Sequence, residues 1–162
     1  PLRHAATAPA LASYQVSFWA VRGQDRAVTV RYQGGQEFLT FTVPDRALEK
    51  GLDGRRLVNG DSIQITLQLD LSEFRVDFEP SGLVFSSRNP ATLRVWYGRM
   101  NPDVDRDGDV DAADQAIIDA GVTYYHYDTG SINWKKIASV VNPVAQTIEA
   151  PISGFSGYVI SW

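Results

Sequence analysis

The sequence contains no cysteine and a single methionine in 162 residues. Without thiols the chain can form neither disulfide bonds nor thiolate metal sites, and cysteine-based catalysis is excluded. No apolar run approaches the ~20 residues that a membrane-spanning helix needs, so no membrane span is expected. Basic residues are also too few for a basic face, since 15 Lys and Arg stand against 19 Asp and Glu. This balance argues against a nucleic-acid partner.

The negative charge is concentrated in one short stretch. Residues 103–114 hold six aspartates and one arginine and carry a charge of −5, whereas the whole chain carries −4. The rest of the chain is therefore nearly neutral. Its 44% hydrophobic and 11% aromatic content is typical of a folded domain of this length. The acidity thus belongs to one local site and not to the surface as a whole.

Most of the chain from residue 14 onward alternates apolar and polar residues with the period of two that strands show. In residues 61–70, for example, isoleucine and leucine occupy every second position. Residues 43–56 break the alternation with proline and glycine and predict a loop with a short helical turn. We expect strands over 14–21, 26–33, 37–43, 61–70, 73–80, 91–98, 122–128, 134–141, 146–152 and 156–162.

These strands predict an all-β fold, a two-sheet antiparallel β-sandwich of immunoglobulin-like type. The sandwich should occupy residues 13–162, with an insertion at 101–121 that holds a calcium loop and a short helix. Residues 1–12, rich in small residues, form a linker-like tail in this interpretation. The tail could also pair as an extended strand against a sheet edge.

The acidic stretch has the ligand spacing of an EF-hand calcium loop. Gly108 stands at the sixth position, where a sharp turn requires glycine, and Val110 stands at the apolar eighth position. Close carboxylates repel one another unless a cation lies between them, and an oxygen-only site favours Ca²⁺. The alternative is a solvated acidic loop without metal. The candidate ligands, at the first, third, fifth, seventh, ninth and twelfth positions, are Asp103, Asp105, Asp107, Asp109, Asp111 and Asp114.

The individual aspartates have different expected roles. Asp109 would offer its backbone carbonyl, Asp111 would act through water, and Asp114 would bind with both carboxylate oxygens. Asp111 can also cap a short helix, which the spacing of alanine and isoleucine predicts up to Gly121.

A loop with aspartate at its twelfth position, followed by a helix and preceded by none, resembles the calcium repeat of dockerins. The stretch follows the pattern D-x-D-x-D-G-x-V-D-x-x-D from Asp103 onward. Dockerins use two such repeats to build their partner-binding surface, and one occurs here. We therefore expect a metal-bound staple that fixes a long connection between strands.

Three other segments resemble the β-sandwich family known as the "ZU-five" domain, found in netrin receptors, ankyrins and bacterial surface proteins. They are "FTVPDRAL" (41–48), "FEPSGLVFSSRNPATLRVWY" (78–97) and "ISGFSGYVISW" (152–162). The resemblance implies a sandwich that serves as an interaction module. Some members of that family cut their own chain before the serine of a His-Phe-Ser motif. Here the triplet Gly154-Phe155-Ser156 lacks the histidine, so we expect the chain to stay whole.

The sequence offers no convincing catalytic constellation, and we expect no enzyme. The segment "GFSGY" lacks the second glycine of a nucleophile elbow, because Tyr158 stands there. His4 lies in the tail, and His126 lies in an aromatic strand where a half-exposed structural role is commoner. Tyr125 and Tyr127 share one face of that strand, and a carbohydrate-binding platform is an alternative to ordinary sheet packing. The four tryptophans are spread along the chain at Trp19, Trp96, Trp134 and Trp162.

Calcium chemistry guides the functional expectation. Loops of extracellular proteins bind Ca²⁺ with dissociation constants of about 10⁻⁴ to 10⁻³ M, far above cytosolic free calcium. We therefore expect an extracellular or cell-surface protein with a structural role that binds copies of itself through its N-terminal segment, as a filament or surface layer. The alternative is a monomeric surface module that binds carbohydrate or another surface protein, in a dockerin-like or adhesive role.

Overall fold

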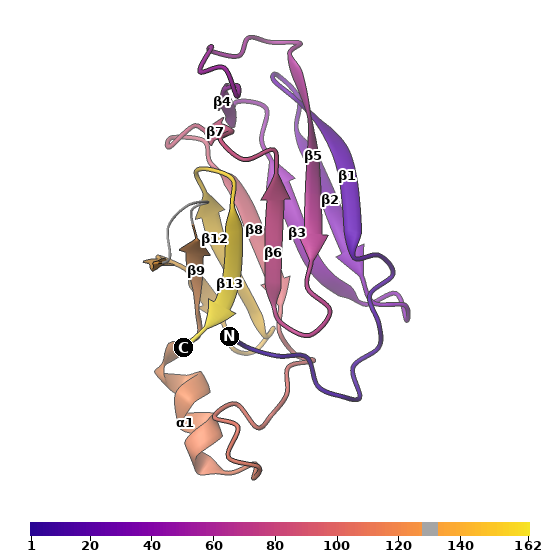
Figure 1. Ribbon diagram of the computed structural model, residues 1–162, viewed down its shortest axis with the longest axis vertical. Helices are drawn as coiled ribbons and strands as arrows, with labels where there is room; N and C mark the ends of the chain where they lie inside the picture. The colour runs from indigo at the N-terminus through magenta and orange to yellow at the C-terminus, as the bar shows by residue number, and fades with distance from the viewer. Residues whose placement is uncertain (128–132) are drawn as a thin grey trace.

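The computed structural model describes residues 1–127 and 133–162. Two large antiparallel sheets face each other, and a short helix lies at one end of the molecule (Figure 1). The expected all-β sandwich is confirmed. Within the described residues, no helix is long and apolar enough to cross a membrane.

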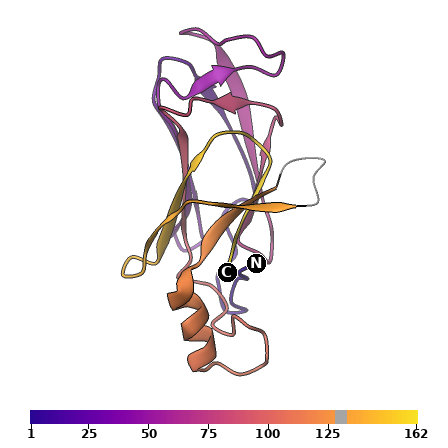
Figure 2. The same cartoon turned by 90° about the vertical axis from the view of Figure 1, so that its left-hand side faces the viewer.

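Each sheet combines strands that are consecutive in sequence with strands that are distant in sequence (Figure 2). The six-stranded sheet has the order β1 (Gln15–Val21), β5 (Ser62–Leu69), β6 (Arg75–Glu79), β13 (Gly157–Ser161), β9 (Thr123–Tyr127) and β10 (Trp134–Ile137). The five-stranded sheet has the order β11 (Val140–Asn142), β12 (Thr147–Ile152), β8 (Ala91–Trp96), β3 (Glu37–Val43) and β2 (Arg26–Arg31). A small third sheet pairs β4 (Leu48–Lys50) with β7 (Val84–Phe85) at the end opposite the helix.

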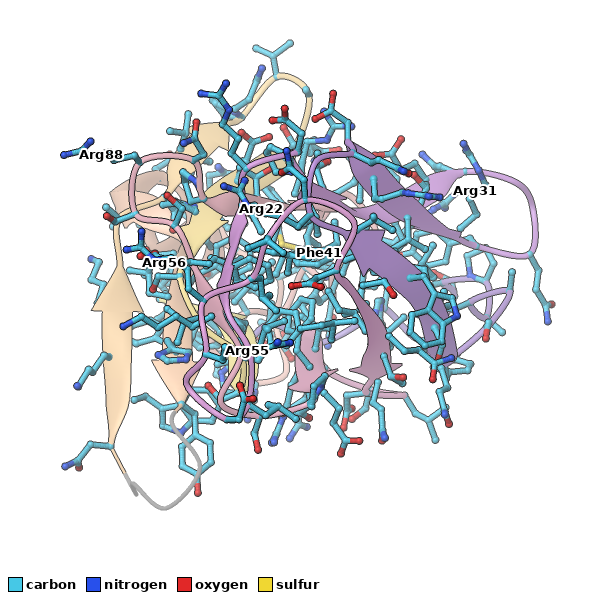
Figure 3. The ribbon with its side chains drawn as sticks, turned by 90° about the horizontal axis from the view of Figure 1, so that it is seen from above. Arg22, Arg31, Phe41, Arg55, Arg56 and Arg88 are labelled. Atoms are coloured by element: carbon cyan, nitrogen blue, oxygen red, sulfur yellow. The ribbon has the colours of Figure 1, made fainter. Side chains whose placement is uncertain are left out.

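The core lies between the two large sheets and follows the alternation of the sequence. Ile65 and Leu67 of β5 are fully buried, as predicted. Phe41 of β3 meets Phe78 of β6 across the core, with ring centroids 4.8 Å apart. Figure 3 shows Phe41 inside the molecule, whereas Arg31 and Arg88 extend outward on opposite sides. Burial of such apolar side chains supplies the main favourable free energy of folding.

Two local expectations are corrected by the structure. Residues 43–56 form no helical turn; they contain β4, which pairs with β7 and buries Leu48. Residues 134–141 do not form one strand. They are divided into β10 and β11, which belong to different sheets, so the chain crosses from one layer to the other at residues 138–139.

The N-terminal segment, residues 1–12, lies along its own sandwich and is not a free linker. Leu2 is buried between β6 and β13: its N–H donates to the Ile160 carbonyl at 2.8 Å, and its carbonyl accepts from the Phe74 N–H at 3.0 Å. Leu11 is also buried and pairs with Tyr32 just after β2. The segment therefore crosses one end of the sandwich and joins both sheets.

The acidic insertion connects the two sheets at this same end. It follows β8 of the five-stranded sheet and precedes β9 of the six-stranded sheet. The helix α1 (Ala112–Gly121) projects from the sandwich below the termini in Figure 1. Tyr124, just after the helix, crosses the core and donates its hydroxyl to the carbonyls of Leu93 and Ile148. The insertion is thus anchored in the core at its exit.

Candidate functional site

Three of the six predicted ligands come together in the folded chain. Carboxylate oxygens of Asp103, Asp105 and Asp114 lie within 4.8 Å of one another, an arrangement that fits a metal ion. Asp103 and Asp105 come from the loop before Gly108, and Asp114 comes from the first turn of α1. Gly108 has a φ of 100°, so the tight turn between these groups requires glycine, as predicted.

Asp114 holds the loop against the start of the helix. One of its oxygens accepts from the N–H groups of Val104 at 2.6 Å and Asp105 at 3.2 Å, and the other accepts from the N–H of Asp111 at 2.9 Å. The backbone hydrogen bond from Asp111, followed by those from Asp105 and Val104, lowers the pKa of Asp114 despite its desolvation. The buried carboxylate therefore stays ionised and available to a cation.

Asp105 and Asp103, the other two members of the triad, are in surroundings that a bound cation would stabilise. A hydrogen bond from the Asp107 N–H lowers the pKa of Asp105, but desolvation and the charges of Asp107, Asp114 and Asp103 outweigh it and raise the pKa. Oδ1 of Asp103 is buried and has no hydrogen-bond partner among the described residues. A buried carboxylate oxygen without a donor is costly unless a cation binds it. The donor set, which consists of oxygens, suits a hard divalent ion.

The remaining three aspartates do not belong to this group of close carboxylates. Asp107 accepts from the Asp109 N–H at 2.9 Å and so shapes the loop. Asp111 is the N-cap of α1; its carboxylate accepts from the Ala113 N–H at 2.7 Å and forms a capping box with Asp114. The predicted helix and its cap are confirmed. Val110, at the apolar eighth position, is 65% exposed, so nothing in the described chain covers it as a second repeat would.

The metal loop and the N-terminal segment are joined by hydrogen bonds that the sequence did not reveal. Arg106 Nη2 donates to the Pro1 carbonyl at 2.9 Å. The segment leading into the loop also pairs with the N-terminus, because the Ala5 N–H donates to the Arg99 carbonyl at 2.9 Å and the Asn101 N–H donates to the Arg3 carbonyl at 2.7 Å. These bonds hold residues 1–5 against the loop and the segment that leads into it.

A serine and a histidine meet in the six-stranded sheet. The side chains of Ser156 and His126 Nε2 lie within hydrogen-bonding distance, because β9 and β13 are paired with Tyr158 opposite His126. The fold thus places a histidine beside Ser156, although the Gly154-Phe155-Ser156 triplet lacks one. The missing histidine is therefore no longer a reason to expect that the chain stays whole. Ser156 is only 5% exposed. His126 is half-buried, as expected.

Two of the four tryptophans lie together with Tyr125, and the other two lie elsewhere. Tyr125, Trp134 and Trp162 line one hollow on the six-stranded sheet. Trp19 stands exposed on β1 at the far edge of the same sheet, and Trp96 packs against the core. The sequence alone could not show this grouping, since Tyr125 and Trp162 are separated by 36 residues and meet through the pairing of β9 with β13.

The chain matches no family model, and comparison with curated proteins and with solved structures finds no match.

Proposed function

We propose that this protein is a non-catalytic, calcium-bound β-sandwich with a structural role outside the cell. The observation that carries the proposal is the triad of Asp103, Asp105 and Asp114, with the unsatisfied buried oxygen of Asp103. The EF-hand spacing of the sequence and the oxygen-only donor set favour Ca²⁺ over softer metals. Calcium here would act as a staple that holds the connection between the two sheets.

An extracellular or cell-surface location follows from the same chemistry. A single loop with several exposed aspartates fits the weak, millimolar class of calcium sites, which fill where free calcium is high. The absence of cysteine from the sequence means that metal binding is the available cross-link for this chain. A structural metal contributes its binding free energy directly to folding.

We also propose that copies of the chain assemble by exchanging residues 1–12. The N-terminal contacts are largely backbone hydrogen bonds to strand ends, and the same bonds form equally well with a neighbouring copy. Where the rotation between neighbouring copies does not close a ring, such head-to-tail donation leads to filaments. The loop would regulate this exchange, since Arg106 contacts Pro1.

The calcium role is tested by thermal unfolding in Ca²⁺ and in chelator. A ligand at 100 times its dissociation constant adds ~2.7 kcal/mol, which raises the melting temperature of a domain of this size by roughly 5–11 °C. Equal melting temperatures in Ca²⁺ and in chelator would refute the proposal that calcium stabilises the fold. Mg²⁺ at the same concentration is the matched control, because it demands a tighter octahedral site.

The assembly role is tested separately by light scattering of the full chain and of a variant that lacks residues 1–12. We expect the full chain to form long particles and the shortened chain to remain monomeric with its β-sheet circular dichroism intact. A full chain that stays monomeric at every concentration contradicts the exchange.

A further inference from the structure

The outer face of the six-stranded sheet carries a groove between a charged wall and an aromatic wall. Its volume is about 310 Å³, and it lies over β6, β13 and β9, near the chain termini in Figure 1. The floor is formed by β13, whose outward residues are small. Register places Val159 between Arg75 of β6 and Tyr125 of β9, so two long side chains flank a short one. The lining residues are Pro1, Glu73, Arg75, Tyr125, Trp134, Val159, Ser161 and Trp162.

The walls of the groove are held in place before any ligand arrives. The Arg75 guanidinium donates to both carboxylate oxygens of Asp77, at 3.1 and 3.2 Å. Its central carbon also lies 5.8 Å from the ring centroid of Trp134, a cation–π contact across the groove. Trp134 also packs against Tyr127 in a tilted arrangement, with ring centroids 5.1 Å apart. Trp134 is nevertheless 40% exposed, as is Trp162. Ordered and exposed aromatic rings cost little further entropy on binding.

We propose that this groove binds a neutral sugar unit of a glycan. A pyranose ring has an apolar face of C–H groups and an equatorial rim of hydroxyl groups. The rings of Tyr125, Trp134 and Trp162 offer flat apolar surfaces for the C–H face of the sugar. The carboxylate of Glu73, the guanidinium of Arg75 and the hydroxyl of Ser161 offer hydrogen-bond acceptors and donors for the hydroxyl groups of the sugar. The volume of the groove lies at the lower end of the range of small-ligand sites and suits one or two sugar rings.

Other classes of ligand fit the groove less well. An extended peptide needs free backbone groups at a sheet edge, but β6, β13 and β9 are each paired on both sides. A purely apolar ligand would remove the charged Glu73 and Arg75 from water without offering either group a hydrogen bond. A nucleic acid needs net positive charge, and here Glu73 and Asp77 accompany the single arginine. A hydroxyl-rich ligand with an apolar face satisfies all parts of the lining.

The proposal is tested by native gels that contain one of five soluble polysaccharides: laminarin, hydroxyethylcellulose, glucomannan, xylan or starch. We expect at least one to retard the calcium-loaded protein and to change its tryptophan fluorescence on titration. Trp134→Ala, Tyr125→Ala and Trp162→Ala should each weaken binding by about tenfold or more, because each removes a ring surface. Trp162 lies outside β13 and is exposed, so its substitution should leave the sheet intact.

Trp19→Ala is the matched control, because it removes another exposed tryptophan from the same sheet, at β1 and outside the groove. It should leave retardation unchanged. Circular dichroism and calcium-dependent melting verify that each variant is folded. The proposal is overturned if none of the five polysaccharides binds the folded protein, or if Trp19→Ala weakens binding as much as Trp134→Ala. These outcomes do not depend on whether the protein assembles.

Discussion

Arg106 in the acidic loop donates a hydrogen bond to the backbone carbonyl of Pro1, 105 residues earlier in the chain. The bond crosses the end of the sandwich where the loop, the N-terminal segment and the last strand meet. A positive φ of 68° at Arg106 directs the loop backbone at this point. The shape of the metal loop therefore determines whether the arginine reaches the N-terminus. Metal binding and docking of the N-terminal segment are predicted to be linked.

Hydrogen exchange measures this link directly. Removal of Ca²⁺ should speed exchange at the amides of Ala5 and Asn101, which bond residues 1–5 to the segment before the loop. The physical reason is that repulsion among the aspartates loosens the loop and lowers the free energy of local opening. Amides in the middle of β5 serve as the internal control, because this strand lies away from the insertion. Unchanged exchange at Ala5 and Asn101 would show that the two segments are independent.

A pair of charge-matched substitutions identifies the ligands. Asp103→Asn removes a carboxylate from the triad and should weaken Ca²⁺ binding about tenfold or more, since affinity follows the number of charged ligands. Asp109→Asn changes the net charge equally but lies outside the triad, and its predicted role uses the backbone carbonyl. It should change the affinity by about twofold or less. Calorimetric titration of both variants at one ionic strength makes the comparison. Equal losses would mean that general charge, and not the triad, attracts the ion.

The sequence predicted the strands and the loop because both are short-range patterns. Alternation in β5 and the capping by Asp111 depend on neighbours a few residues apart, and these were predicted correctly. The pairing of Ser156 with His126, or of Leu2 with Ile160, depends on which strands become neighbours. No spacing in a single sequence encodes that register, so these contacts could not be foreseen.

The division between β10 and β11 illustrates the same limit on a smaller scale. Residues 134–141 are rich in aromatic and β-branched residues, which suggests one strand, and neither Gly nor Pro marks the crossing at 138–139. Tertiary packing determines the break, because β10 pairs with β9 and β11 pairs with β12 in the opposite sheet. Strand preference is known to depend on such context.

Gly98, which follows β8 and precedes the insertion, provides a test of packing. A Cβ atom at Gly98 would overlap the indole ring of Trp96 and lie 2.6 Å from Gln146 Oε1. Gly98→Ala should therefore destabilise the fold by about 1–3 kcal/mol, as overpacking does. Gly34→Ala is the control, because a Cβ there meets no atom within 4 Å. Its effect should stay within about 0.5 kcal/mol of zero, or be slightly stabilising. Denaturant unfolding of both variants measures the difference.

Chain integrity tests the consequence of the contact between Ser156 and His126. We predict an uncut chain of 17.9 kDa by intact-mass measurement. The reason is structural: the Ser156 carbonyl accepts from the Phe78 N–H at 3.1 Å, and neither Phe155 nor Ser156 has the positive φ that would strain the backbone on either side of the peptide bond between them. A fragment that begins at Ser156, lost in Ser156→Ala, would contradict the prediction.

Acid should loosen the N-terminal segment through His4. Its ring stacks on Phe74 with centroids 4.2 Å apart and packs edge-on against Tyr32, and its Nε2 is buried with no hydrogen-bond partner among the described residues. Burial lowers the pKa of His4 below the usual 6.5, although the charge of Asp70 acts in the opposite direction. The folded chain therefore binds this proton more weakly than the unfolded chain. The resulting stability is complete above about pH 6.5 and is lost as the pH falls from there toward the lower folded-state pKa.

The measurement is the melting temperature at saturating Ca²⁺ between pH 7.5 and pH 5.5. The native chain should lose a few degrees across this window. His4→Phe keeps an aromatic ring against Phe74 but cannot take up a proton, so its melting temperature should fall less. His126 is present in both proteins, and its contribution cancels in the comparison. Parallel curves for the two proteins would show that protonation of His4 does not control the docking of the N-terminal segment.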